Sequence, residues 1–152
     1  MIKQICWDMD GTLADFYNVP NWLEKIRAFD PSPYAEAKPL WDMKALTGIL
    51  HQLQENGIEI AIITWMSKES TPDFDKATRK AKLQWLAQYD FPYDYFHCLQ
   101  YGTTKANSVR KRLKDGEAIL IDDNKKVRAG WSLGTTIDPT TENIIEILKE
   151  LI

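Results

Sequence analysis

The segment over residues 58–64 constrains the fold most, because it is apolar on both faces along most of its length. A strand inside a parallel sheet is covered on both sides and carries such a run. Further strands are predicted over 2–8, 95–99, 118–122 and 135–137, and helices over 42–56, 72–89, 104–114, 125–131 and 140–151. This alternation predicts an α/β fold with a doubly wound, mainly parallel sheet.

The 152 residues are the size of a single domain, and we expect one domain over 1–152. Residues 12–39 interrupt the alternation, because this stretch carries four prolines and is irregular apart from a short helix over 21–29 that Asn21 caps. No internal repeat divides the chain.

Composition argues against a membrane or exported protein. No apolar run approaches the roughly 18–20 residues of a membrane-spanning helix, and Asp8 interrupts the N-terminus before a signal-peptide core could form. Cys6 and Cys98 fall in apolar segments, where a free cysteine behaves as a small hydrophobic residue. With a net charge of −3, we expect a cytoplasmic protein without disulfides.

Polar residues stand where the predicted strands end. These residues are Asp8, Thr64, Lys105, Asp122 and Asp123. Each has an ordinary explanation alone, as a helix cap, a strand residue or a surface lysine. In doubly wound sheets, however, ligands bind outside the carboxyl ends of the strands, where these side chains would converge. Carboxylates gathered there repel one another unless a cation neutralises them, and Mg²⁺ is a cation that prefers oxygen ligands. A Thr hydroxyl and a Lys ammonium nearby could bind the oxygens of a phosphoryl group.

Residues 8–13, DMDGTL, resemble the first motif, DxDGT, of the haloacid dehalogenase-like (HAD) phosphatase superfamily. Thr64, Lys105 and the pair Asp122–Asp123 follow in that family's order, and the resemblance extends over residues 2–128. Within that family the chain resembles small members such as deoxyribonucleotide 5′-nucleotidases and the 3′-phosphatase domain of phage polynucleotide kinases. The resemblance implies a Rossmann-like core and a Mg²⁺-dependent phosphomonoester hydrolase.

The resemblance also implies residue roles. Asp8 attacks phosphorus and forms an aspartyl-phosphate, while Asp10 protonates the leaving oxygen and then deprotonates water. Thr64 hydrogen-bonds the phosphoryl group, and Lys105 neutralises its charge and fixes Asp8. Gly11 and Thr12 shape the turn that presents both carboxylates.

Metal ligands are implied as well: Asp8, the backbone carbonyl of Asp10, and the pair Asp122 and Asp123. Which member of the pair contacts the ion stays open. The family often carries a further acid four or five residues later, where this chain has basic and apolar residues, so the pair has to serve instead. An acid at position 10 marks phosphatases and phosphomutases, and disfavours dehalogenases and ATPases.

Family members select substrates with an insert after the first motif, the cap, which here spans only about 14–39. So short a cap favours small phosphate esters or exposed phosphate ends. Aromatic residues near the motifs either stack a nucleobase or pack in the core; they are Phe16, Tyr17, Trp22, Trp41 and Trp65, and Trp65 is also assigned to the phosphate-binding turn.

Basic residues outnumber acidic ones by 12 to 6 over residues 76–128. The segments 76–82 and 105–114 either track a polynucleotide backbone or are solvated helix faces. A nucleotide or a nucleic-acid end is therefore a candidate substrate.

Two other functions stay open. A phospho-accepting receiver domain uses similar residues, but its acidic pair comes first along the chain and it has no counterpart of Asp10. A catalytically idle HAD-like binding module is the second alternative, although every motif residue is present.

Overall fold

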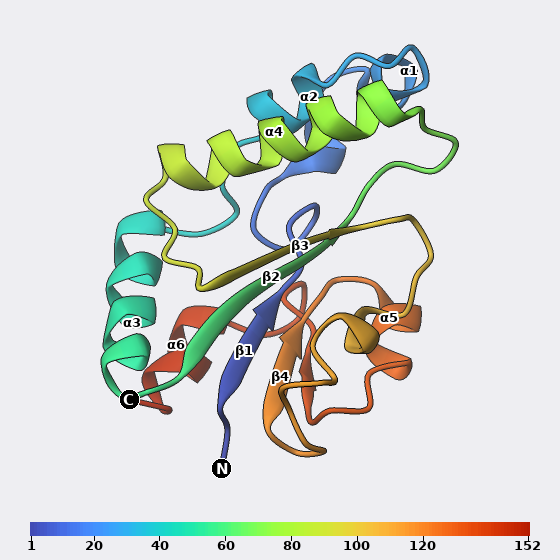
Figure 1. Cartoon of the computed structure of the whole chain (residues 1–152). Coiled ribbons are helices and arrows are strands. Elements are labelled where there is room, and N and C mark those ends of the chain that lie inside the picture. Colours follow the sequence, from blue (N-terminus) through green and yellow to red (C-terminus); the bar gives the residue numbers. More distant parts are fainter.

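The computed structural model describes all residues, 1–152, and its centre is a five-stranded, all-parallel sheet (Figure 1). The strand order is β3-β2-β1-β4-β5, so the central β1 pairs with both β2 and β4. The chain order reverses at β1, which makes its carboxyl end the topological switch point. The strands are Gln4–Trp7 (β1), Glu59–Trp65 (β2), Tyr95–Leu99 (β3), Ala118–Ile121 (β4) and Thr136–Ile137 (β5). The predicted α/β fold with a parallel sheet is confirmed.

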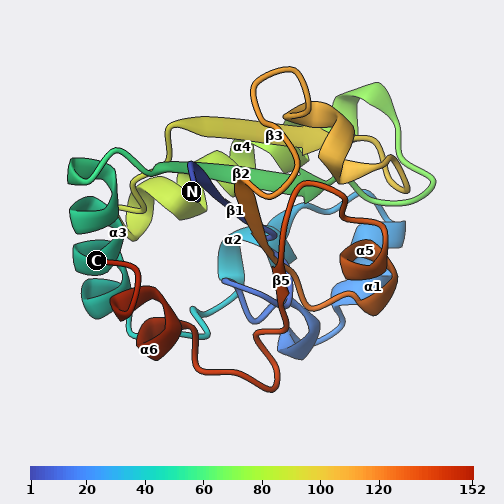
Figure 2. The same cartoon turned by 90° about the horizontal axis from the view of Figure 1, so that it is seen from below.

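Two separate apolar layers cover the sheet. Alternate residues of β1 point to opposite faces, so Ile5 and Trp7 join one cluster and Cys6 the other. The first cluster is formed with α3 (Met43–Glu55), α4 (Pro72–Gln88) and α6 (Ile144–Lys149), and Figure 2 shows α3 and α6 side by side. The second is closed by residues that follow β3 and β4, among them Val109, Leu113 and Leu133.

The helix expected over 104–114 is wrong. Only a 3-10 turn, η2 (Lys105–Ser108), forms there. The Ser108 hydroxyl donates to the Lys105 carbonyl at 2.7 Å, and Val109 and Arg112 donate to carbonyls three residues back. These local bonds compete with the i to i−4 ladder of an α-helix. The terminal helix is also shorter than predicted.

The insert after the first strand carries more structure than its prolines indicate. It holds η1 (Phe16–Asn18), the expected α1 (Trp22–Arg27) and an unexpected α2 (Ser32–Glu36). Asn21 precedes α1 but adopts a left-handed conformation and makes no side-chain cap bond, so its predicted capping role is wrong. A third apolar cluster joins the insert to α4, and its members are Phe16, Ile26, Tyr34, Phe74 and Ala81.

The insert is tied at both ends to the loop that follows β1. Ala14 forms bridges with Asp10 and Pro39, and Leu40 N donates to Leu13 O at 2.9 Å. The insert and α4 therefore form a layer next to this loop, on the side opposite the chain termini (Figure 1). The remaining helix is α5 (Lys125–Ala129). None of the helices combines the length and apolar character needed to cross a membrane.

Gly134 lets the chain pass directly against β4. It has φ +154°, and a Cβ at this position would overlap the backbone carbonyl of Ala118. Gly134→Ala should therefore lower the free energy of unfolding by roughly 2–4 kcal/mol. Gly48→Ala is the matched control, because a Cβ there meets open space within α3 and should stabilise the protein by up to about 1 kcal/mol. Urea denaturation measures both, and equal midpoints for the two variants would contradict the packing described.

Candidate active site

A tight turn after β1 presents two carboxylates at the tip of the strand. The Asp8 N–H donates to Ile121 O at 3.0 Å, which continues the sheet by one residue. The Met9 carbonyl then accepts from the N–H groups of residues 12, 13 and 14 at 2.8–3.1 Å, and Gly11 adopts φ +79°. A Cβ on Gly11 would overlap the Asp123 carboxylate, so only glycine fits this close approach.

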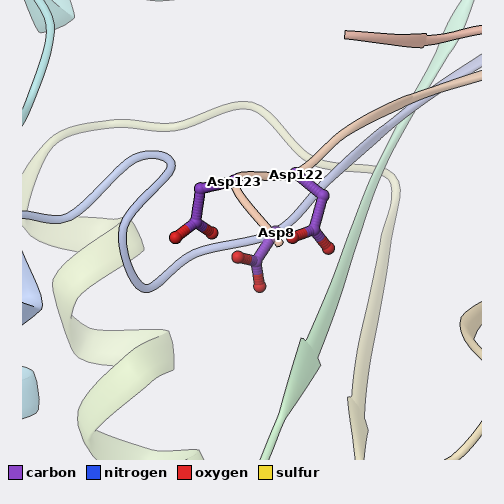
Figure 3. Close-up of side chains that lie close together, drawn as sticks. All are labelled: Asp8, Asp122 and Asp123. Carbon is purple, nitrogen blue, oxygen red and sulfur yellow. The ribbon is translucent and has the colours of Figure 1, made fainter. Parts of the chain in front are cut away.

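Three carboxylates from two adjacent strands meet beside this turn. Asp8 follows β1, and Asp122 and Asp123 follow β4 (Figure 3). One oxygen from each lies within 4.8 Å of the others, a spacing that a single metal ion could bridge. Thr12 fixes the arrangement, because its hydroxyl lies 3.3 Å from Asp8 Oδ2 and 3.2 Å from Asp123 Oδ1 and accepts from the Asp123 N–H at 3.1 Å.

Lys105 is buried between two of these carboxylates. Its Nζ donates to Asp8 Oδ1 at 3.0 Å and to Asp122 Oδ2 at 2.8 Å. The loop that carries Lys105 is held by Trp65, whose Nε1 donates to Thr103 O at 3.0 Å and whose ring lies 5.4 Å from the ammonium. Burial alone would lower the pKa of Lys105, but the two carboxylates outweigh it and raise that pKa.

A second buried lysine, Lys82 on α4, contacts Asp10, the other carboxylate of the turn. Its Nζ donates to Asp10 Oδ2 at 3.1 Å, to Thr64 Oγ1 at 2.6 Å and to Trp65 O at 2.9 Å. The sequence pattern predicts Lys82 in an exposed basic segment, and this prediction is wrong, because its side chain is only 1% exposed. Helical spacing carries the missed signal, since Lys82 lies four residues after buried Thr78 and three before buried Trp85.

The site holds more negative charge than its lysines balance. Burial raises the pKa of Asp123 to about 8, helped by the charges of Asp8 and Asp122. Burial and the Asp8 charge raise the pKa of Asp122 to about 6. For Asp8 itself the effect of burial is outweighed by Lys105, which lowers its pKa, whereas burial keeps the pKa of Asp10 raised despite Lys82. A divalent cation among these oxygens would supply the missing positive charge.

These groups form the floor of a cleft of about 980 Å³. Its walls are rich in aromatic side chains, which come from the insert, from the end of β2 and from the loop after β3: Phe16, Tyr17, Trp22, Tyr34, Trp65 and Tyr101. Of the aromatic residues singled out in the sequence, only Trp41 lies elsewhere. Its Nε1 donates to Thr12 O at 2.7 Å, and its ring packs against the main core.

The structure places most of the predicted site residues at one cleft, while Thr64 is buried behind it. Asp8, Asp10, Asp122 and Asp123 line one cleft with Lys105 and Trp65. Gly11 and Thr12 form the turn beside it, and Thr64 lies next to it through Lys82. The exposed basic residues of α4, Lys76, Arg79 and Lys80, line a separate shallow groove.

No protein-family model and no curated protein matches the sequence, whereas twelve chains of solved structures match the fold. A chain of the Pnkp1/Rnl/Hen1 RNA repair complex aligns with a TM-score of 0.60 at 16% identity, over 91% of this chain and 42% of that one. The D,D-heptose 1,7-bisphosphate phosphatase from Burkholderia thailandensis aligns with a TM-score of 0.54 at 16% identity, over 88% and 74%.

The α/β fold of this chain is therefore shared with these two solved structures. A Had-superfamily hydrolase from Ehrlichia chaffeensis also aligns, over 99% of this chain and 98% of its own, at 15% identity and a TM-score of 0.49. The chain spans less than half of the matched chain from the RNA repair complex. Similarity at these identities shows the fold alone, so activity and substrate have to be argued from the site.

The raised pKa values of Asp122 and Asp123 predict an unusual pH dependence of stability. In EDTA, both groups stay protonated in the folded protein at a pH where unfolded aspartates are already ionised. The free energy of unfolding should therefore fall by roughly 1–3 kcal/mol as the pH rises from about 5 to about 8, because the folded state binds more protons. The opposite contribution of Asp8, whose pKa is lowered, is confined to pH below its usual value.

Thermal unfolding in EDTA at several pH values measures this slope. Asp123→Asn should remove most of it, the exposed Asp115→Asn should leave it intact, and Mg²⁺ should stabilise the wild-type protein more at pH 8 than at pH 6. Stability in EDTA that stays constant or rises over this range would contradict the charge imbalance described.

Proposed function

We propose that this protein is a Mg²⁺-dependent phosphomonoester hydrolase that works through an aspartyl-phosphate on Asp8. One observation carries the proposal: the Asp8 carboxylate, paired with Lys105, lies beside Asp122 and Asp123 at the floor of an open cleft, with Asp10 two residues on. A nucleophile, an acid and a cation site are thereby within reach of one phosphoryl group.

The reaction has two balanced steps. First, an Asp8 oxygen bonds to phosphorus, the bond to the leaving oxygen breaks, and the Asp10 carboxyl gives its proton to that oxygen, which releases an alcohol. Second, Asp10 takes a proton from water as the water oxygen bonds to phosphorus and the Asp8–phosphorus bond breaks. Orthophosphate leaves, and both carboxyl groups return to their starting states.

The raised pKa of Asp10 suits this role, because a buried carboxyl that keeps its proton can act as an acid. Lys105 already touches Asp8 and would stabilise the negative charge that develops on the phosphoryl oxygens, and Thr64 would hydrogen-bond them. In the present arrangement the Thr64 hydroxyl lies 2.6 Å from Lys82 Nζ, which orients it.

The carboxylate cluster fits a Mg²⁺ ion, since its donors are oxygens and its charge is in excess. When bound, the ion would clamp the phosphoryl group and offset the repulsion between two anions. Asp8, Asp123 and the backbone carbonyl of Asp10 would hold it. We assign Asp123 rather than Asp122, because Asp122 is fully buried with hydrogen bonds from Lys105 and from the Asn124 N–H, whereas only Oδ1 of Asp123 is engaged, by Thr12.

The substrate we propose is a nucleotide or a nucleic-acid end with an exposed phosphate. Residues 14–39 would act as a small cap within a single domain, since the insert lies over the turn that bears Asp8 and Asp10. The aromatic walls of the cleft suit the flat face of a base. The RNA repair complex among the structural neighbours is compatible with such a substrate, whereas the heptose bisphosphate phosphatase favours a sugar phosphate as the competing candidate.

Asp8→Asn should abolish phosphate release. The change removes the nucleophile but keeps the shape of the side chain, so we expect a loss of at least about 10⁴-fold. The assay measures phosphate from nucleoside monophosphates, sugar phosphates, 3′-phosphorylated oligonucleotides and p-nitrophenyl phosphate, with Mg²⁺ and with EDTA.

Asp115→Asn is the control, because this aspartate is exposed and lies outside the cleft. Release that continues in EDTA, or in Asp8→Asn at the wild-type rate, would rule out the proposed mechanism. A folded wild-type protein that binds Mg²⁺ but hydrolyses nothing in the panel would favour an idle binding module.

Tyr101 tests the aromatic part of the proposal. It is exposed at the cleft wall, and its ring lies 5.1 Å from that of Trp65. Tyr101→Ala should raise KM for a nucleoside monophosphate about tenfold, the size of one lost stacking contact, and leave KM for glycerol phosphate unchanged. Tyr101→Phe keeps the ring and should behave as wild type. Equal changes for both substrates would refute base stacking at this wall.

A further inference from the structure

Lys82 is the most completely enclosed basic group in the molecule, with a side chain only 1% exposed. An ammonium in such a place is stable only when its charge is paired and its hydrogens are accepted. All three of its hydrogens have an acceptor, in Asp10 Oδ2, Thr64 Oγ1 and Trp65 O. The lysine is therefore held in one orientation by strand β2 on one side and by Asp10 on the other.

Asp10 depends on this contact more than on any other. The contact with Lys82 is the only hydrogen bond that the Asp10 side chain makes, and it engages Oδ2 alone, so Oδ1 is the oxygen that would carry the proton in the first step. The residue lines the cleft and its side chain is 18% exposed, so the other oxygen stays available to a substrate. One carboxylate oxygen is thus anchored to β2 through Lys82 while its partner faces the reaction space.

The cap covers Lys82 from the opposite direction. The ring of Tyr34, on α2, lies 5.0 Å from Nζ and is stacked on Phe16 at 4.8 Å. On the next turn of α4, Trp85 Nε1 donates to Ala37 O at 2.7 Å, which fixes α2 against α4. The aromatic face excludes water from the ammonium and leaves it no alternative partner.

The two buried lysines therefore contact different carboxylates. Lys105 touches Asp8 and Asp122, whereas Lys82 touches Asp10 and neither of those two. If the lysines only neutralised the carboxylates, a cation at any position among the four aspartates would do so. The separate contacts indicate separate functions in the reaction cycle.

We propose that Lys82 is a positioning residue for proton transfer: it fixes the Asp10 carboxyl group so that the free oxygen faces the leaving group. This inference rests on the proposed function, and it concerns only the step in which the leaving oxygen is protonated. Lys82 itself exchanges no proton with the substrate and contacts no reacting atom.

The dependence of the rate on the leaving group tests this role. An alkyl phosphate needs protonation of its leaving oxygen, whereas 2,4-dinitrophenyl phosphate releases a stable phenolate without it. Lys82→Met should slow the release of the alcohol about 10²- to 10³-fold and the release of the phenolate less than about tenfold, as expected when general acid catalysis is lost. Single-turnover release by rapid quench measures the first step alone, for glycerol phosphate and for the aryl ester.

Two further variants sharpen the test. Lys80→Met makes the same chemical change on the exposed side of α4 and should match wild type on both substrates. Lys82→Met in an Asp10→Asn background should cause no further loss with glycerol phosphate, because both changes remove one function. If Lys82→Met does not fold, Lys82→Arg keeps the buried charge, and the same split between substrates is expected of it.

Equal losses on the two substrates would overturn the inference, because they would indicate a structural or phosphate-binding role. Unchanged alcohol release, or additive losses in the double variant, would overturn it as well. A wild-type protein that releases neither alcohol nor phenolate would instead overturn the proposed function, and this inference with it.

Discussion

The Lys105 ammonium lies between Asp8 and Asp122, and the site depends on that bridge. Adjacent parallel strands end side by side, so β1 and β4 force the two carboxylates together wherever the sheet forms. Removing one partner of such a buried pair typically costs about 3–5 kcal/mol, because the other charge is left uncompensated. Lys105 comes from beyond β3 and thereby ties a loop with little regular structure to the centre of the sheet.

A second constraint acts through the insert. Its ends are hydrogen-bonded to the turn after β1, and its apolar cluster continues onto α4. The aromatic wall of the cleft and the surroundings of Lys82 are therefore parts of one packed unit. Tyr34 connects them, because it lines the cleft and its ring also contacts the Lys82 ammonium. Under the proposed function, substrate selection and the placement of Asp10 would be linked, because the insert forms part of the cleft wall and also covers Lys82.

Most of the site could be predicted from the sequence because each group follows an apolar strand, and strand ends converge in a parallel sheet. Lys82 could not be found that way, since it lies in a helix; its inward spacing was obscured by the basic residues around it. The segment after Lys105 favours a helix by local pattern, yet the Ser108 hydroxyl and the buried lysine hold it in a tighter turn. Pairings of side chains across 72 residues, as between Asp10 and Lys82, are not encoded in local spacing.

An aspartyl-phosphate on Asp8 can be detected by trapping it chemically. During turnover of an aryl phosphate with Mg²⁺, reduction with borohydride converts an aspartyl-phosphate to homoserine, which peptide mass spectrometry locates. Homoserine is expected at position 8 and at no other aspartate, and its formation should require both substrate and metal. Phosphate release without modification of Asp8, or modification at Asp10, Asp122 or Asp123 instead, would contradict it.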